Sequence, residues 1–233
     1  PTSTPLYSSA ASDVYKRQLQ TTLKDLIDKG VKAVYVVGDV SNLQDLDGLH
    51  HEVVDRLGPI DILVNNAGGS VARASVDGTS LGDFQKTFDL NLHSSYRLMQ
   101  LVTPHMKERK WGRIINIASI WGREYGGNIG YMSAKAALIA ATKHSAVDLA
   151  KHGILVNSIA PGSISHHEGS WERFQRDNPE DVVEEFIKDN LPLGRFGWPE
   201  PLGDMIAFLA SERAGMITGA SIVVDGGQSI SMI

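Results

Sequence analysis

The stretch IDILVNNAG, residues 60–68, joins a short apolar run directly to two asparagines and a glycine. Four other runs share its near-continuous apolar character, without the clean alternation of a strand that faces water on one side. Such runs are typical of parallel strands that are covered on both faces. The five predicted strands are VKAVYVVGDV (31–40), IDILVNNAG (60–68), GRIINIAS (112–119), ILVNSIAPG (154–162) and ASIVVDGG (220–227).

Longer amphipathic stretches separate the apolar runs, which gives a repeated strand–helix–strand order. This order predicts right-handed crossovers and a doubly wound α/β fold, with helices on both faces of one parallel sheet. We find no internal repeat and no linker that would separate a second domain. The predicted helices lie near 19–29, 42–57, 80–109, 131–152 and 200–211.

The composition excludes several classes of protein. Of the 233 residues, 42% are hydrophobic and 21% are charged, which is enough apolar material for a sizeable core. A net charge of -5 argues against a nucleic-acid partner, because such a partner needs a basic face. No apolar run approaches the roughly 18 residues that a membrane-spanning helix needs, and the first residues do not have the pattern of a signal peptide. We therefore expect a cytoplasmic globular protein with no nucleic-acid and no membrane partner.

Small or polar residues follow four of the predicted strands. Ligands of parallel α/β sheets bind beyond the carboxyl ends of the strands, so this edge is the expected site. Glycine lets a flat ligand approach the backbone, and asparagine offers amide hydrogen bonds. Each residue alone fits an ordinary turn, and the case for a site depends on their shared position. They are Gly38 and Asp39, Asn65 to Gly68, Ser119, and Pro161 with Gly162.

Tyr131 and Lys135 stand four residues apart at the start of the helical run GYMSAKAALIAATKHSAVDLA (130–150). Residues i and i+4 share one helix face, so the ammonium of Lys135 is expected close to the phenol of Tyr131. A nearby positive charge favours phenolate, which predicts a pKa for Tyr131 below its usual value of about 10. Such a phenol is a credible general acid or base, and Ser119 is placed to hydrogen-bond a carbonyl oxygen beside it.

With these residues the chain resembles the short-chain dehydrogenase/reductase family in its single-domain form. The resemblance runs from about Leu19 to the end and is closest to 3-oxoacyl-[acyl-carrier-protein] reductase-like members. The order of the motifs makes it specific, although each motif alone is not. They are NNAG (65–68), Asn91 in FDLNL, Ser119 in IINIAS, Tyr131 and Lys135 in YMSAK, Pro161 and Gly162 in VNSIAPG, and the C-terminal ITGASIVVDGG.

The resemblance implies an NAD(P)-dependent oxidoreductase that interconverts a secondary alcohol and a ketone by hydride transfer. Tyr131 would act as general acid or base on the substrate oxygen, and Ser119 would orient that oxygen. Lys135 would lower the tyrosine pKa and hydrogen-bond the cofactor ribose. Asn91 would hold a water that links Lys135 to solvent.

The resemblance also implies which residues contact the NAD or NADP, and that the substrate is a small carbonyl or alcohol. A homotetramer or homodimer would form through the helices at 80–109 and 131–152. Asp39 and Val40 would flank the adenine, Asn65, Asn66, Ala67 and Gly68 would line the adenosine and ribose, and Pro161, Gly162 and Ile164 would face the nicotinamide beside Tyr131 and Lys135.

Two other segments have simpler interpretations. The cluster His166-His167-Glu168 is a substrate-facing or solvated loop more often than a ligand set, so no metal is predicted. The basic stretch MKERKWGR, residues 106–113, precedes a strand at the edge opposite the site and is expected to be a solvated face with Trp111 packed on it.

The segment WGREYGGNIG (121–130) and a mobile lid over 166–190 are expected to form the pocket wall. In it, Trp121, Tyr125 and Trp171 would supply apolar surface, and Arg123 and Glu124 would bind polar groups.

The front of the chain departs from the family. The family's first strand, its glycine-rich turn and its second strand have no counterpart, since no glycine occurs before Gly30. One codon choice for DVYKRQ resembles a transposon end used in sequencing libraries. We therefore interpret residues 1–18 as a non-native leader and 19–233 as one Rossmann-like domain that lacks its first two strands. A gap between 31–40 and 60–68 is expected, which would make this chain unstable or weakly binding.

Two other functions stay open beside the oxidoreductase. An inactive fragment would bind cofactor weakly without turnover, although Asn91, Ser119, Tyr131 and Lys135 are all intact. A sugar-nucleotide epimerase or dehydratase also uses a tyrosine–lysine pair, but it needs a substrate domain after the last strand.

Overall fold

The core of the computed structural model is a parallel sheet, and the model describes residues 13–71 and 75–232. Within those residues the strand order is β1-β2-β3-β4. Short runs of valine and isoleucine favour extended backbone, and the two middle strands are almost wholly buried, as their continuous apolar character predicts. The strands are β1 (Ile62–Asn65), β2 (Gly112–Ile117), β3 (Ile154–Pro161) and β4 (Ser221–Val224).

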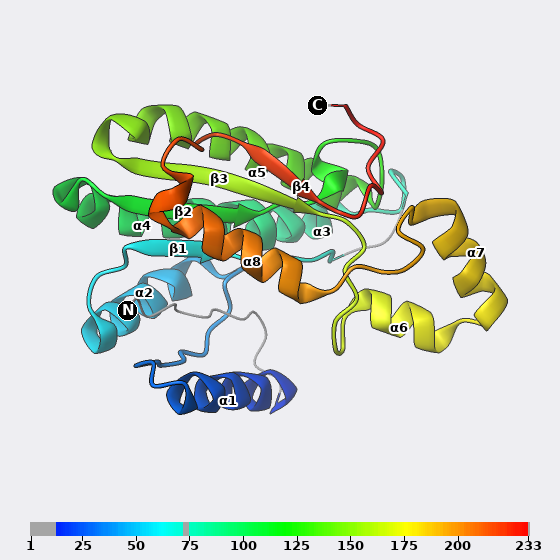
Figure 1. Ribbon diagram of the computed structural model, residues 1–233, viewed down its shortest axis with the longest axis horizontal. Coiled ribbons are helices and arrows are strands. Elements are labelled where there is room, and N and C mark those ends of the chain that lie inside the picture. Colours follow the sequence, from blue (N-terminus) through cyan, green and yellow to red (C-terminus); the bar gives the residue numbers. More distant parts are fainter. Residues whose placement is uncertain (1–12, 72–74, 233) are drawn as a thin grey trace.

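The predicted helices are present, and the long one expected over 80–109 is divided. A π-helical turn, Asp89–His93, separates α3 (Leu81–Phe88) from α4 (Ser94–Arg109). Two short helices, α6 and α7, lie beyond the carboxyl ends of the strands, on the right of Figure 1. The remaining bounds are α1 (Asp13–Asp28), α2 (Leu43–Leu57), α5 (Ile129–Leu149), α6 (Ser170–Asp177), α7 (Glu180–Asn190) and α8 (Pro199–Ala210).

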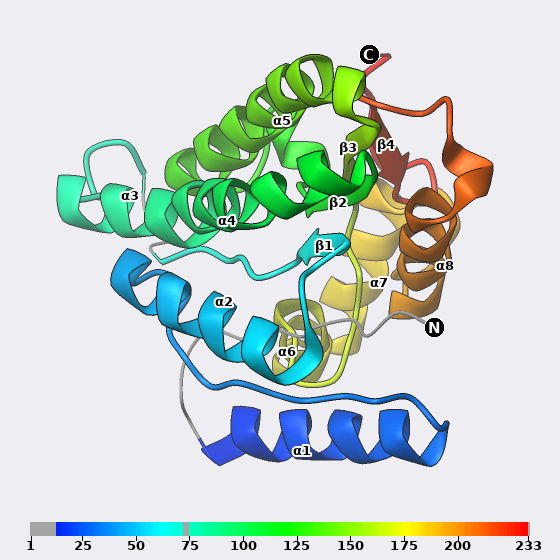
Figure 2. The same ribbon diagram turned by 90° about the vertical axis from the view of Figure 1, so that its left-hand side faces the viewer.

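Helices cover both faces of the sheet, as a doubly wound fold requires (Figure 2). On one face α2, α4 and α5 enclose a large core with β1 to β3, in which Leu46, Met106 and Ile114 have no exposed surface. On the other face α8 packs on β2 and β3, and Ile115, Ile159 and Leu209 are buried in a cluster that residues of β1 and β4 complete. The prediction of a Rossmann-like α/β fold is confirmed.

The strand predicted at 31–40 is wrong. This segment is irregular apart from a single bridge residue, Tyr35, and it runs between α1 and α2 (Figure 2). Val36 and Val40 are nevertheless buried in the core that α2 and α4 form. The apolar run therefore reports side-chain burial, whereas a strand also needs a neighbouring backbone to pair with.

The expected leader falls partly outside the described residues. Residues 1–12 are among those not described, and α1 begins at Asp13, six residues before Leu19. The expectations that residues 1–18 are non-native and that two strands are missing stay predictions. In the described part of the chain, no helix is long and apolar enough to cross a membrane.

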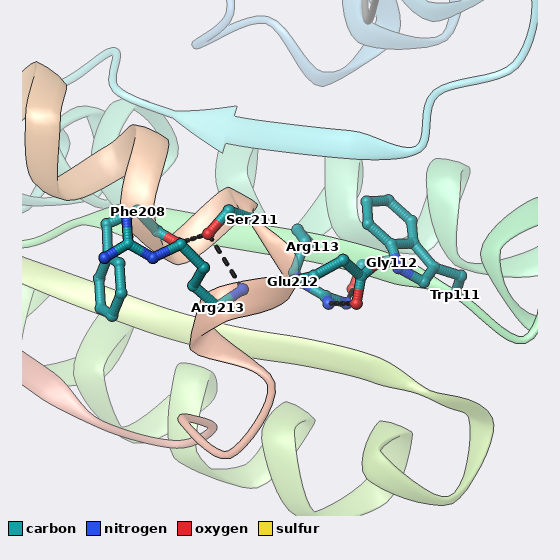
Figure 3. A network of polar contacts seen from close by, with 7 residues as sticks. All are labelled: Trp111, Gly112, Arg113, Phe208, Ser211, Glu212 and Arg213. Carbon is teal, nitrogen blue, oxygen red and sulfur yellow. Dashed lines mark hydrogen bonds and ion pairs between the residues drawn. The ribbon is translucent and has the colours of Figure 1, made fainter.

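Residues 107–110 of the basic stretch are exposed, as expected, but the stretch ends in a polar network at the amino end of the sheet (Figure 3). Arg113 of β2 is only 3% exposed, and its guanidinium lies 4.5 Å from the centre of the Trp111 ring. Arg113 also donates to the carbonyl of Gly112 at 2.9 Å and lies 3.5 Å from the carboxylate of Glu212. The Trp111 indole donates to the same carboxylate at 2.6 Å. Trp111 does pack there, but Arg113 is buried because alternate residues of a covered strand all face protein.

Candidate active site

Ser119 lies two residues beyond the end of β2, at the carboxyl edge of the sheet. It is 6% exposed, and its hydroxyl accepts a hydrogen bond from the Trp121 backbone N–H at 3.2 Å, which caps the short helical turn 120–122. This cap fixes the side chain at the point where the chain leaves the sheet.

Tyr131 lies in the first turn of α5 and faces Ser119. Asn128 caps this helix by accepting a hydrogen bond from the Tyr131 N–H at 3.0 Å. Burial raises the pKa of the Tyr131 phenol, and a hydrogen bond with Ser119 partly offsets that rise. The expected lowering of this pKa is therefore wrong for this structure, because desolvation outweighs the stabilisation of phenolate. Tyr131 is a protonated phenol at neutral pH.

Lys135 is one helical turn further along α5 and is 2% exposed. Its ammonium donates to the carbonyl of Ile117 at 2.7 Å and lies 5.5 Å from the centre of the Tyr131 ring. Burial lowers the pKa of Lys135 to about 8. The two predicted partners do lie together, and the ammonium donates to a carbonyl at the end of β2.

Asn91 occupies the π-helical turn between α3 and α4 and has no exposed surface. Its amide donates to the carbonyls of Gly69 and Thr87, both at 2.7 Å, and accepts from the Gly69 N–H at 3.0 Å. Asn91 thus fixes the loop after β1 by two hydrogen bonds. π-Helical turns often mark functional positions, because the extra residue in the turn frees backbone groups and redirects a side chain.

Gly68 brings the backbone of that loop against the other two groups. A Cβ built at Gly68 would lie 2.8 Å from Asn91 Oδ1 and 2.8 Å from Lys135 Nζ. A side chain at this position would therefore have to displace one of them. The structure brings Asn91, Gly68 and Lys135 together on one side of the site, and Ser119 with Tyr131 on the other.

The polar residues after β1 differ in exposure. Asn65 is 6% exposed and donates to Asn116 Oδ1 at 2.8 Å, while its own side-chain oxygen is buried without a hydrogen bond. Asn66 and Gly68 are exposed, and Ala67 packs against the core. Asn66 and Gly68 are thus open to solvent at this edge, whereas the Asn65 amide is used inside the protein.

Asp39 and Val40 lie just before α2. The Asp39 carboxylate accepts hydrogen bonds from the N–H and the hydroxyl of Ser41, at 2.9 and 2.7 Å, and Val40 is 1% exposed. They form the turn into the helix. Their expected contact with adenine stays a prediction.

Pro161 ends β3, and Gly162 and Ile164 follow in a clamped turn. A Cβ at Gly162 would lie 2.7 Å from the Gln228 side-chain oxygen, which accepts from the Ser163 N–H at 2.7 Å. Ile164 pairs with Gly197 in an isolated parallel bridge. The backbone beyond β3 is therefore fixed from two sides, and the expected contact with a nicotinamide stays a prediction.

Sequence reasoning missed a buried amide network beneath the site. Asn116 of β2 has no exposed surface and donates to Thr142 of α5 at 2.8 Å while it accepts from Asn65. The parallel register places Asn65 opposite Asn116, so two polar residues at one level of the sheet satisfy each other. The sequence signal for this network was one asparagine inside each of two apolar runs. Asn128 and Gln228 were missed as well. Asn128 could have been recognised as the cap of a predicted helix, whereas Gln228 gives no such signal.

The two charged residues of the loop after β2 were expected to face the site, and the structure directs both of them elsewhere. Glu124 accepts hydrogen bonds from the backbone N–H groups of Ile230 and Ser231, at 3.0 and 2.8 Å. Arg123 donates to the carbonyl of Ser221 at 2.7 Å. Both side chains hold the loop to the C-terminal part of the chain. Tyr125, in the same loop, is 95% exposed.

The histidine cluster makes short local contacts. His167 lies 3.5 Å from Glu172, and the His166 ring contacts the His167 carbonyl at 3.0 Å. In the described ranges, no three side chains of His, Asp or Glu are grouped as a metal site would need.

Comparison with known proteins places this geometry in a family. Residues 8–229 match a family model described as "Enoyl-(Acyl carrier protein) reductase". The chain is 33% identical to "(2S)-[(R)-hydroxy(phenyl)methyl]succinyl-CoA dehydrogenase subunit BbsD" of Thauera aromatica, over 94% of this chain and 85% of that one. It is 32% identical to the 3-oxoacyl-[acyl-carrier-protein] reductase FabG of Staphylococcus aureus, over 91% of this chain and 83% of that one.

Two solved structures share the fold over nearly the whole chain. L-Sorbose reductase from Gluconobacter frateurii, complexed with NADPH and L-sorbose, has a TM-score of 0.87 and 29% identity, over 97% of this chain and 87% of that one. A 7α-hydroxysteroid dehydrogenase, complexed with NADH and 7-oxo glycochenodeoxycholic acid, has a TM-score of 0.83 and 28% identity, over 97% and 85%.

The chain therefore belongs to the short-chain dehydrogenase/reductase family, whose members are NAD(P)-dependent dehydrogenases and reductases. Within that family it is similar to the 3-oxoacyl-[acyl-carrier-protein] reductases, as the motifs indicated.

Lys135 and Gly68 have the chemistry to hold the ribose of such a cofactor. Lys135 has three donors and uses one of them on Ile117, which leaves donors for the hydroxyls of a ribose. Gly68 is exposed and lets a ligand approach the backbone beside this ammonium.

Proposed function

We propose that this protein is an NAD(P)-dependent oxidoreductase that interconverts a secondary alcohol and a ketone, with Tyr131 as general acid and base. The observation that carries the proposal is the juxtaposition of the Tyr131 phenol, hydrogen-bonded to Ser119, with the buried ammonium of Lys135 one turn away. Family membership supports the reaction class, and the geometry supports the roles of these residues.

The chemistry divides between the cofactor and the chain. When bound, the nicotinamide supplies or accepts the hydride. Ser119 and Tyr131 hydrogen-bond the substrate oxygen, which holds the carbonyl carbon in one orientation and stabilises the charge that develops on the oxygen. In the direction of reduction, the Tyr131 hydroxyl gives its proton to that oxygen. Its raised pKa keeps the proton on the phenol at neutral pH, which suits reduction.

The reverse direction needs the phenolate. Because burial raises the pKa of Tyr131, oxidation of an alcohol should become faster as the pH rises above neutrality, while ketone reduction should not. Lys135, whose pKa is about 8, remains largely protonated at pH 7 and supplies the positive charge near the developing phenolate.

The test is a Tyr131→Phe variant assayed with NADH and NADPH and a panel of ketones. General acid–base catalysis contributes about 100- to 10,000-fold, so kcat should fall by that factor while cofactor affinity is kept. Tyr125→Phe is the matched control, because this nearby hydroxyl is on a side chain that is 95% exposed. Unchanged turnover in Tyr131→Phe would refute the assignment.

An inactive fragment that binds cofactor weakly is the second candidate. It is favoured by β1, which has a strand neighbour on one side only among the described residues, and by the 31–40 segment, which does not join the sheet. Titration with NADH and then NADPH, followed by nicotinamide fluorescence, separates the two. Weak binding without turnover supports the fragment. A cytoplasmic location and a homo-oligomer remain predictions.

A further inference from the structure

Trp121 lies beside Tyr131, the proposed general acid and base. It follows Ser119 by two residues, and its ring stands edge-on to Tyr131, with 6.4 Å between ring centres and 81° between ring planes. The backbone of Gly126 and Gly127 packs against the indole so closely that a Cβ on Gly126 would overlap it, and one on Gly127 would lie 2.8 Å from it. Two consecutive glycines therefore fix the position of this ring.

The indole joins a larger group of rings contributed by the segment beyond β3. Trp171 of α6 lies 6.5 Å from Trp121, and it contacts Phe174, Phe186 and Phe196 with ring-centre separations of 5.7, 5.0 and 5.4 Å. Phe196 is 8% exposed and anchors the group, whereas Trp121 and Trp171 keep part of their surface open. An apolar wall thus extends from Tyr131 to α6 and α7, beyond the strand ends in Figure 1.

The charged side chains of the same loop are directed elsewhere. Arg123 is held by the Ser221 carbonyl, and Glu124 by two backbone N–H groups of the C-terminal segment. A polyhydroxylated or carboxylate-rich substrate would need polar partners where this loop offers an indole. Ring-on-ring packing, by contrast, adds favourable edge or offset contacts to the burial of apolar area.

We propose that the substrate of the Tyr131 site carries an aromatic or alicyclic ring next to its reacting carbon, and that Trp121 is the specificity-determining residue that packs on this ring. The inference rests on the proposed function and specifies its substrate class. Trp121 contributes binding to the ring and takes no part in proton transfer, because its indole N–H is not directed to the Ser119–Tyr131 pair by any contact in the described residues.

A matched substrate pair tests this assignment. Ethyl benzoylacetate and ethyl acetoacetate are both 3-oxo esters and differ in a phenyl group against a methyl group at the reacting carbon. A single apolar pocket contact discriminates by about 10- to 200-fold, so wild-type kcat/KM should favour the phenyl ester by at least about 10-fold. L-Sorbose serves as the polyol and should be the poorest substrate of the three.

The variants locate the preference. Trp121→Ala should lose most of the phenyl preference and change kcat/KM for ethyl acetoacetate by less than about 3-fold, while Trp121→Phe should keep part of it. Tyr125→Ala, an exposed aromatic of the same loop, should keep the wild-type ratio. If Trp121→Ala does not fold, the wild-type ratio and Trp121→Phe still decide.

The outcomes separate this inference from the function on which it rests. Turnover with equal or better kcat/KM for ethyl acetoacetate or L-sorbose overturns the substrate class and leaves the oxidoreductase in place. A phenyl preference that persists unchanged in Trp121→Ala overturns the role of Trp121. If no ketone is turned over although NADH or NADPH binds, the proposed function fails, and the inference fails with it.

Discussion

The two ends of the sheet each bury one cation, and they do so in different ways. At the amino end, Arg113 has a carboxylate at 3.5 Å, a carbonyl and the face of the Trp111 ring as partners. At the carboxyl end, Lys135 donates to the Ile117 carbonyl and has no ion-pair partner in the described part of the chain. Its pKa falls to about 8.

This difference indicates that Arg113 has a structural role and Lys135 a functional one. A buried charge without a counter-charge is costly to the folded state, so a chain retains it only where something else requires it. The carboxylate, the carbonyl and the Trp111 ring compensate the burial of Arg113 only in part, because burial still lowers the pKa of its guanidinium and its Nε is buried without a hydrogen bond. Lys135 uses one of its three donors on Ile117, and we propose that the others bind a ligand beside the exposed Gly68.

The largest expected effect that tests this contrast is the change in the free energy of unfolding with pH. The folded-state pKa of Lys135 is about 8, against 10.5 for a free lysine. Between these values the unfolded chain binds more protons, so raising the pH through this window favours the folded state. The free energy of unfolding should rise by about 3 kcal/mol from this group alone.

Urea unfolding at pH 7.5, 9 and 10.5 measures the rise, and Lys135→Met should remove it. Lys143→Met, an exposed lysine of the same helix, is the matched control and should leave the slope unchanged. An equal slope in Lys135→Met and wild type would show that the ammonium is not desolvated as described.

The next effect tests whether the amino end of the sheet contributes to stability alone. Gly153 precedes β3 with a φ of +73°, and a Cβ there would overlap the backbone carbonyl of Lys110. Gly153→Ala should therefore cost roughly 2 kcal/mol or more in unfolding free energy, because strain and overlap add. Cofactor affinity at 10 °C, where the variant stays folded, should match wild type, and a selective loss of affinity would contradict the contrast.

Its counterpart at the carboxyl end is Gly68→Ala. The new Cβ would lie 2.8 Å from both Asn91 Oδ1 and Lys135 Nζ, so at least one of these side-chain ends must shift. We expect affinity for NADH or NADPH to fall by at least about 10-fold, or about 1.4 kcal/mol, with a smaller change in unfolding free energy. Fluorescence titration and urea unfolding of the same sample measure the affinity and the stability. A variant that loses stability but keeps its affinity for the cofactor would show that Gly68 has only a structural role, like Gly153.

The smallest effect concerns the partner of Arg113. The Glu212 side chain is 79% exposed, so solvent screens its attraction to the guanidinium. Glu212→Gln keeps an acceptor for the Trp111 indole and removes only the charge. A loss below about 1 kcal/mol is expected at low salt, shrinking at 0.5 M NaCl. Glu185→Gln on α7 is the control, and a loss that salt does not reduce would mean that the network depends on hydrogen bonding alone.

Much of the fold could be predicted from the sequence, and the exceptions have physical causes. The runs at 60–68, 112–119, 154–162 and 220–227 contain the four strands, because strands covered on both faces must be apolar. The run at 31–40 has the same composition and is not a strand. Burial of Val36 and Val40 accounts for its apolar character, and hydrogen-bond partners distant in sequence leave no local trace.

The site shows the same division between contact and environment. Helical spacing predicted that Lys135 would lie beside Tyr131, and it does. The direction of the tyrosine pKa was wrong, since it depends on how completely water is excluded, which the sequence does not state. Glu124 and Arg123 were placed in the pocket because they belong to the right loop, yet their partners come from residues about 100 positions later.

The π-helical turn at Asp89–His93 has a consequence for insertions and deletions during evolution. A π-turn is an α-helix with one residue added, so loss of one residue there would restore regular helix and rotate α3 by roughly 100° relative to α4. Thr87, now packed beside Gly130 at the start of α5, would then face another direction. Single-residue deletions should therefore be excluded from this turn in active relatives, while the exposed loops of the same chain accept changes in length.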